Sequence, residues 1–203
     1  MFYDPRSESH GLARNPWTAL VVPRPIGWIS SLSPSGVANL APYSYFNAVS
    51  AMPPFVMFSS TGRKDSQENI EATGEFVVNM AVANLQDEVN QSSAPFNAEV
   101  DEFERTGLAK AACRNVSVPR VAASPVALEC ILNKVVPLIA RDGKKVGSEV
   151  IFGEVVGIHI ADEVIVDGRL DTAGMRPLAR LGYMDYAVTE ETFSMKRPVL
   201  EDD

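Results

Sequence analysis

Residues 23–60, PRPIGWISSLSPSGVANLAPYSYFNAVSAMPPFVMFSS, decide the fold class of this chain. Apolar and β-branched runs at 26–32 and 37–49 are typical of strands, and Ser33-Pro34-Ser35-Gly36 supplies turn residues between them. After two prolines, the run FVMFSS at 55–60 has the composition of a buried strand. The stretch therefore predicts a hairpin that leads into a third strand, followed by a buried one.

The clearest helix signal follows this stretch, at 65–73. Asp65 is a suitable N-cap, Glu68 is its capping-box partner three residues later, and Gly74 suits the C-terminal end. Asp142-Gly143, between two β-rich runs, is typical of a hairpin turn.

The remaining segments are mostly β-like. Strands are predicted at 76–82 and 126–139, two more within 148–168, and a closing segment at 178–188; helices are predicted within 84–96 and around 101–107. This pattern of seven to nine strands with two or three peripheral helices predicts a mainly β protein, with the strand spacing of a barrel or sandwich.

Length and composition bound the function classes. With 203 residues, 46% of them hydrophobic, the chain is expected to form one domain over 1–203, with an extended arm at 1–17 and a loose acidic tail at 191–203. The net charge of −8 argues against a nucleic-acid partner. No apolar stretch is long enough for a transmembrane helix and the first residues lack a secretion signal, so neither membrane insertion nor export is expected and the predicted location is cytoplasmic.

Several catalytic motifs do not occur. The chain contains no G-x-G-x-x-G, no P-loop, no H-E-x-x-H and no G-x-S-x-G. Cys113 and Cys130 form no C-x-x-C pair, and the histidines are His10 and His159, so no metal site is predicted. His159 lies in an apolar strand, where a structural role competes with a catalytic one.

Two features suit a ligand. Arg63 and Lys64 directly precede the helix at 65–73, whose free N–H groups and Ser66 hydroxyl suit a phosphate; the alternative is a solvated cation pair before an ordinary helix. Residues 39–47 combine small, amide, hydroxyl and aromatic side chains, as a planar ring would require; the alternative is a core strand. Together the two features indicate a ligand that is part ring and part phosphate, such as flavin mononucleotide (FMN), which also brings its own redox chemistry.

The motif order resembles that of the flavin reductase-like, FMN-binding split-barrel family. The resemblance rests on a strand ending in Ser-Ser, then G-x-x-N-x-A-P-x-S-x-F, then Pro-Pro, then K-D-S-x-x-N-I, and it covers roughly 18–190. It implies an antiparallel, Greek-key-like split barrel and a homodimer with FMN near the subunit interface. The residues expected to contact FMN are Ser30, Ser31, Asn39, Ala41, Pro42, Ser44, Phe46, Ser59, Ser60, Arg63, Lys64, Ser66, Arg180 and Tyr183.

The resemblance also implies a function. We expect an NAD(P)H-dependent flavin reductase, with NADH or NADPH as transient hydride donor, that supplies reduced FMN to a partner monooxygenase. The alternatives are an electron carrier like the flavoredoxins, reduced by a protein partner, a flavin-free binding module, and an oxidase of the pyridoxamine-phosphate type.

Overall fold

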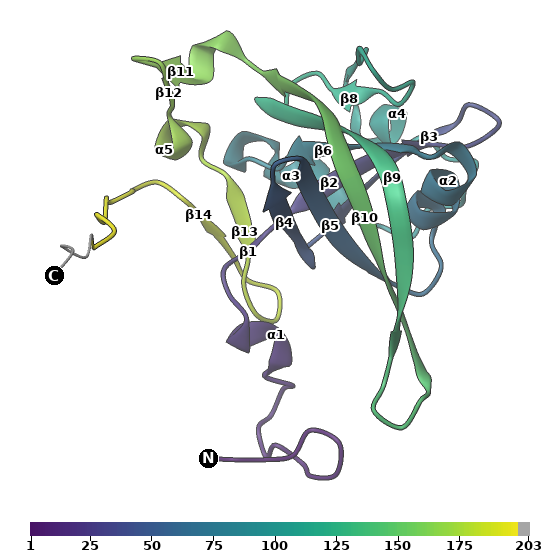
Figure 1. The fold of residues 1–203 in the computed structure, drawn as a ribbon, viewed down its shortest axis with the longest axis vertical. Helices are drawn as coiled ribbons and strands as arrows, with labels where there is room; N and C mark the ends of the chain where they lie inside the picture. Colours follow the sequence, from purple (N-terminus) through teal and green to yellow (C-terminus); the bar gives the residue numbers. More distant parts are fainter. Residues whose placement is uncertain (199–203) are drawn as a thin grey trace, which may run out of the picture.

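A seven-stranded antiparallel sheet forms the body of the protein, which a computed structural model describes over residues 1–198 (Figure 1). Its strands lie in the order β3-β2-β6-β9-β10-β5-β4. Their bounds are β2 (Gly27–Leu32), β3 (Ala38–Tyr43), β4 (Phe46–Ala51), β5 (Pro54–Thr61), β6 (Glu75–Met80), β9 (Val126–Ile139) and β10 (Lys145–Ile160). The predicted hairpin, third strand and buried strand are therefore confirmed as β2, β3, β4 and β5.

The two edge strands of this sheet are neighbours in the sequence. β3 ends at Tyr43 and β4 begins at Phe46, so only Ser44 and Tyr45 join opposite edges. Since two residues span at most about 7 Å, the sheet must curl until its edges approach each other. β3 and β4 do not pair with each other, so the barrel stays open along this line, and the fold is a split barrel.

The strands of the large sheet bury apolar side chains on both of their faces. One cluster includes Trp28 and Leu40 together with Phe103 from a short helix, and all three are fully buried. A second includes Phe58 and Phe76, whose rings meet edge to face with centroids 5.8 Å apart. These buried clusters therefore fix the positions of the strands that border the open edge.

The helix at 65–73 is confirmed as α2 (Asp65–Thr73), but the prediction that Asp65 caps it is wrong. The N-cap is Lys64, which is extended (φ −123°, ψ 164°), and no side chain caps the helix. Asp65 is instead the first helical residue, where its carboxylate still favours the positive end of the helix dipole. Gly74 ends the helix in the left-handed conformation expected of it (φ 77°) and donates its N–H to the Ile70 carbonyl at 2.8 Å.

Four further helices are short. α3 (Gln86–Gln91), which follows a 3-10 turn (Ala83–Leu85), and α4 (Glu102–Thr106) confirm the predictions within 84–96 and around 101–107, whereas α1 (Trp17–Leu20) and α5 (Thr172–Met175) were not predicted. Among residues 1–198, no helix is long and apolar enough to cross a membrane.

A small three-stranded sheet packs beside the barrel and joins a segment near the start of the chain to one near its end (Figure 1). It contains β1 (Arg24–Pro25), β13 (Leu178–Arg180) and β14 (Tyr186–Val188). The remaining elements are the pairs β7 (Lys110–Ala111) with β8 (Arg120–Val121) and β11 (Ile165–Val166) with β12 (Arg169–Leu170), and a 3-10 turn at Asp162–Val164. The arm before α1 projects from the body (Figure 1). Of the predicted tail, 191–198 has no helix or strand, and the rest lies outside the described residues.

Candidate functional site

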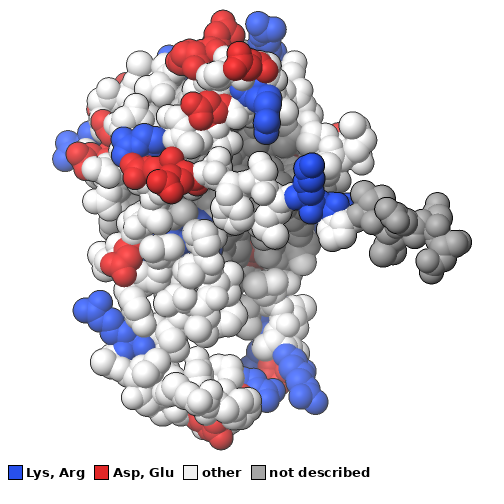
Figure 2. Space-filling view, turned by 90° about the vertical axis from the view of Figure 1, so that its left-hand side faces the viewer, with Lys and Arg blue, Asp and Glu red and all other residues white. Residues whose placement is uncertain are grey.

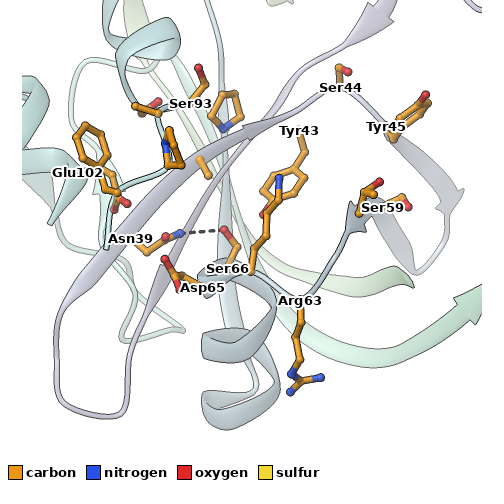
Figure 3. Close-up of a pocket in the computed structure, with 18 residues that line it drawn as sticks. Asn39, Tyr43, Ser44, Tyr45, Ser59, Arg63, Asp65, Ser66, Ser93 and Glu102 are labelled. Carbon is orange, nitrogen blue, oxygen red and sulfur yellow. Dashed lines mark hydrogen bonds between the residues drawn. The ribbon is translucent and has the colours of Figure 1, made fainter. Parts of the chain in front are cut away.

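A cavity of about 470 Å³ lies where β3 passes into β4 at the open edge of the barrel (Figure 3). It lies between the start of α2, the joint between the two edge strands, and the loop that follows α3. Its lining residues are Asn39, Ala41, Pro42, Tyr43, Ser44, Tyr45, Ser59, Thr61, Arg63, Lys64, Asp65, Ser66, Ser92, Ser93, Ala94, Pro95, Phe96 and Glu102. The two ligand-like features of the sequence therefore meet in one cavity.

The first turn of α2 forms one end of this cavity. Because no side chain caps the helix, its first N–H groups remain available to a ligand. The buried Ser66 hydroxyl accepts a hydrogen bond from the Asn39 amide at 2.9 Å (Figure 3), and Asn69 donates to Ser31 at 3.2 Å. These contacts fix the helix start against β2 and β3.

The two adjacent cations play different roles. Arg63 pairs with Glu71 and with Glu68 (3.4 Å), and its guanidinium points away from the cavity in Figure 3. Glu71 raises the pKa of Arg63, while the pKa of Glu71 is lowered, first by the Gln67 amide and then by Arg63. Lys64 forms no ion pair within residues 1–198, so its charge remains available at the helix start.

Tyr43 offers an unused donor. Its side chain is 7% exposed, its hydroxyl is buried without a hydrogen-bond partner among the described residues, and its ring packs on Phe58 with centroids 4.7 Å apart. Burial raises its pKa, so the phenol stays protonated at neutral pH. A buried hydroxyl without a partner is costly, which indicates that a ligand or water completes it.

The opposite wall comes from distant parts of the chain. The Trp28 indole donates to the Ser92 hydroxyl at 2.9 Å and so anchors the loop 92–96. Glu102, 5% exposed, accepts the Leu40 backbone N–H at 3.0 Å, and burial raises its pKa. Tyr43, Tyr45 and Thr61 also line the cavity but were not predicted as contact residues, although they lie within or beside the sequence motifs. No local signal in the sequence identifies Ser92 or Glu102.

Eight of the fourteen predicted contact residues line the cavity, namely Asn39, Ala41, Pro42, Ser44, Ser59, Arg63, Lys64 and Ser66. Four others are buried behind it or used elsewhere. Ser30 donates to the Pro119 carbonyl at 2.7 Å, Ser31 accepts from two asparagines, and Ser60 donates to the Gly62 carbonyl at 3.0 Å. The Phe46 ring packs so closely over Gly27 that a Cβ there would lie 2.6 Å from it. Of these four residues, Ser31 has a hydrogen bond to a residue that lines the cavity, Asn39, at 3.4 Å.

The last two predicted residues, Arg180 and Tyr183, line a second cavity of about 370 Å³. It shares Pro42, Ser44 and Ser93 with the first, so the two cavities adjoin.

His159 lies in a third cavity that shares no residue with the first. Its Nε2 is 2.5 Å from the Glu129 carboxylate, which also accepts the backbone N–H groups of Arg114 (2.9 Å) and Asn115 (2.6 Å). Burial opposes ionisation of Glu129, but these hydrogen bonds and His159 lower its pKa. Cys113 completes a group of potential metal ligands within 4.8 Å, which the sequence spacing did not indicate. In the structure, Glu129 uses its oxygens to hold the loop at 114–115 against the barrel.

The face of the molecule seen in Figure 2 carries scattered Lys and Arg, with Asp and Glu gathered at its upper end and a broad uncharged area between. No continuous basic surface is present on this face, in agreement with the net charge of −8.

Comparison with known proteins gives a consistent picture. The family model described as the flavin reductase like domain matches residues 19–179. The chain is 37% identical to an uncharacterized protein of Halalkalibacterium halodurans over 186 residues, covering 89% of this chain and 88% of the other. Its fold matches nitrilotriacetate monooxygenase component B from Bacillus cereus (30% identity, TM-score 0.87, 96% and 98% of the chains) and a 2-nitrobenzoate 2-nitroreductase from Pseudomonas fluorescens (27% identity, TM-score 0.84, 100% and 99%). The chain belongs to the flavin reductase-like family.

Proposed function

We propose that this protein is an NAD(P)H-dependent FMN reductase that binds FMN in the cavity at the open edge of the barrel. The observation that carries the proposal is the pairing, in one cavity, of an uncapped helix start bearing Lys64 with the aromatic and backbone surface of residues 41–45. The first end suits a phosphate and the second suits a planar ring.

The phosphate end fits FMN in charge and hydrogen bonding. The first N–H groups of α2, the Lys64 ammonium and the Thr61 hydroxyl are all donors. The buried Tyr43 hydroxyl lacks a partner and lines the same cavity. Asp65 and Glu102 also line it, so the cations and N–H groups must outweigh two carboxyl groups. Arg63, already paired with two glutamates, contributes less.

The ring end fits a flavin by shape and by the backbone it exposes. Pro42 and Tyr45 provide apolar surface, and the backbone around Ala41 belongs to β3, an edge strand that has no neighbour on this side. Its polar groups are therefore available to the ring. When bound, FMN accepts the hydride itself, so these residues need only bind, orient and shield the ring.

We also propose that the protein is a homodimer, as the family resemblance implies. Val156, Ile158 and Ile160 alternate along β10 and are 38–57% exposed, so this strand presents an apolar outer face. Val49 on β4 is likewise 49% exposed. Sedimentation velocity is expected to give twice the mass of one chain, and Ile158→Glu to give single chains.

The partner and the location are further proposals. The similarity to a monooxygenase component B supports a flavin-dependent monooxygenase as the consumer of reduced FMN. A cytoplasmic location agrees with this role, because NAD(P)H is a cytoplasmic reductant.

The test is an anaerobic absorbance titration with FMN, followed by NADH or NADPH. We expect bound flavin whose bands bleach at a catalytic rate with one donor. Bound flavin that neither nicotinamide bleaches would contradict the reductase and favour an electron carrier reduced by a protein. Failure to bind FMN would overturn the whole proposal.

A further inference from the structure

Two arginines face the second cavity without any acidic partner. This cavity is lined by Thr18, Arg24, Ile26, Pro42, Ser44, Asn90, Ser93, Arg180, Tyr183, Met184 and Tyr186. Neither arginine forms an ion pair within residues 1–198, and no Asp or Glu lines the cavity. In a chain with a net charge of −8, this is a local excess of positive charge.

Arg24 is 6% exposed, and among residues 1–198 its hydrogen-bond partners are all backbone carbonyls. It donates to Thr18, to Val21 at 2.7 Å and to Leu181 at 2.8 Å. Its Nε–H is buried and has no partner among the described residues. A buried cation without a counter-charge is energetically costly, so an anion that bound next to Arg24 would be stabilised.

Arg180, on β13, is the direct cross-strand partner of Arg24 on β1 and lines the same cavity. It donates to the Tyr186 hydroxyl and to the Tyr183 carbonyl, and its guanidinium lies 4.5 Å from the centre of the Tyr186 ring. Tyr183 holds a left-handed backbone (φ 57°), which is rare for an aromatic residue. The two tyrosines thus give the cavity ring-bearing walls beside its charges.

We propose that this second cavity binds an anionic group of the second substrate, a phosphate or carboxylate carried on a ring-bearing molecule. The proposal rests on the proposed function, because the cavity reaches the ring end of the FMN site through Pro42, Ser44 and Ser93. Lys64 and Ser66 line only the first cavity, so the two anion-binding positions are separate. Arg180 is the specificity-determining residue, since Arg24 is tied to the backbone.

The two sources of such an anion are the diphosphate of the nicotinamide dinucleotide and the carboxylate of an aromatic acid. The test is calorimetric titration of FMN-loaded protein with NAD⁺ and, separately, with benzoate. Whichever probe binds wild type, we expect its affinity for Arg180→Gln to be about 10- to 100-fold lower, the range of a charge-assisted contact. Arg180→Lys should lose less of this affinity. Arg176 lies on the same segment but outside this cavity, so Arg176→Gln should bind the probe as wild type does.

The outcomes separate this inference from the proposed function. If Arg180→Gln binds NAD⁺ more weakly than wild type does, the bound anion is the dinucleotide diphosphate. If it binds benzoate more weakly, the anion is the carboxylate of an acceptor. The inference is overturned if Arg180→Gln binds both probes as wild type does, or if neither probe binds wild type. FMN affinity should be unchanged in Arg180→Gln, and bleaching of wild type by NADH tests the reductase independently. Salt titration of wild type gives a second readout that needs no variant, since screening should weaken probe binding.

Discussion

The Asn39 amide donates to the Ser66 hydroxyl at 2.9 Å and so joins two sequence motifs that lie 27 residues apart. Asn39 also contacts the Ser31 hydroxyl at 3.4 Å, and all three side chains are buried. The strand that carries the ring end of the site is thereby fixed to the helix that carries the phosphate end. This contact therefore sets the spacing between the two ends of the proposed FMN site.

Asn39→Ala should therefore weaken both stability and FMN binding. The change leaves two buried hydroxyls with fewer partners, which costs about 1–3 kcal/mol in the free energy of unfolding. Urea unfolding measures the first effect and FMN titration the second. The exposed Asn47→Ala is the matched control, and equal losses in both variants would show that the bridge has no special role.

Lys64→Ala should weaken FMN binding by about 1.5–3 kcal/mol, because a charge-assisted contact to the phosphate is lost. The barrel should remain folded, since Lys64 has no ion pair within the described residues. Calorimetric titration with FMN is the measurement, and Lys144→Ala in the exposed hairpin turn is the control. An unchanged FMN affinity would refute the phosphate assignment.

Glu102 gives a pH prediction. Burial raises its pKa in the folded protein above the ordinary value of 4.5, so the folded state holds this proton more tightly than the unfolded chain does. The corresponding stabilisation is complete below the unfolded pKa and is lost as pH rises through the folded pKa. Glu102→Gln, whose oxygen can still accept the Leu40 N–H, should thus be more stable than wild type at pH 8, by a smaller margin at pH 5. Urea unfolding at both pH values checks this, with the exposed Glu104→Gln as control; a pH-independent difference would contradict it.

Cys113 should be a slow nucleophile. Burial, and then the Glu129 carboxylate, raise its pKa to about 11. At pH 8 the thiolate fraction is on the order of 100-fold below that of an ordinary cysteine. A disulfide reagent such as dithiobis-nitrobenzoate should react slowly with a Cys130→Ala variant and rapidly once urea is added. Equal rates before and after unfolding would mean that Cys113 is not protected.

The strand pattern of residues 23–60 was predictable because turn residues and alternation act locally. The N-cap of α2 was misassigned because Asp65 has a side chain typical of N-caps but is already the first helical residue. The extended backbone at Lys64 determines where the helix starts. The wall formed by Ser92 and Glu102 was beyond prediction, since its anchors lie 64 and 62 residues away, at Trp28 and Leu40. Arg180 and Tyr183 were predicted as part of one site, and the fold places them in the adjoining cavity.

The two-residue joint between β3 and β4 also sets how far this chain can vary in length. One extra residue at Ser44-Tyr45 would turn alternate side chains of β4 to the wrong face of the sheet and move the ring end of the site away from the helix. The exposed turn at Asp142-Gly143 closes a hairpin far from any such constraint and can grow or shrink freely. Tags, loops and fused domains therefore belong at residues 141–144, whereas the joint at 44–45 has a fixed length.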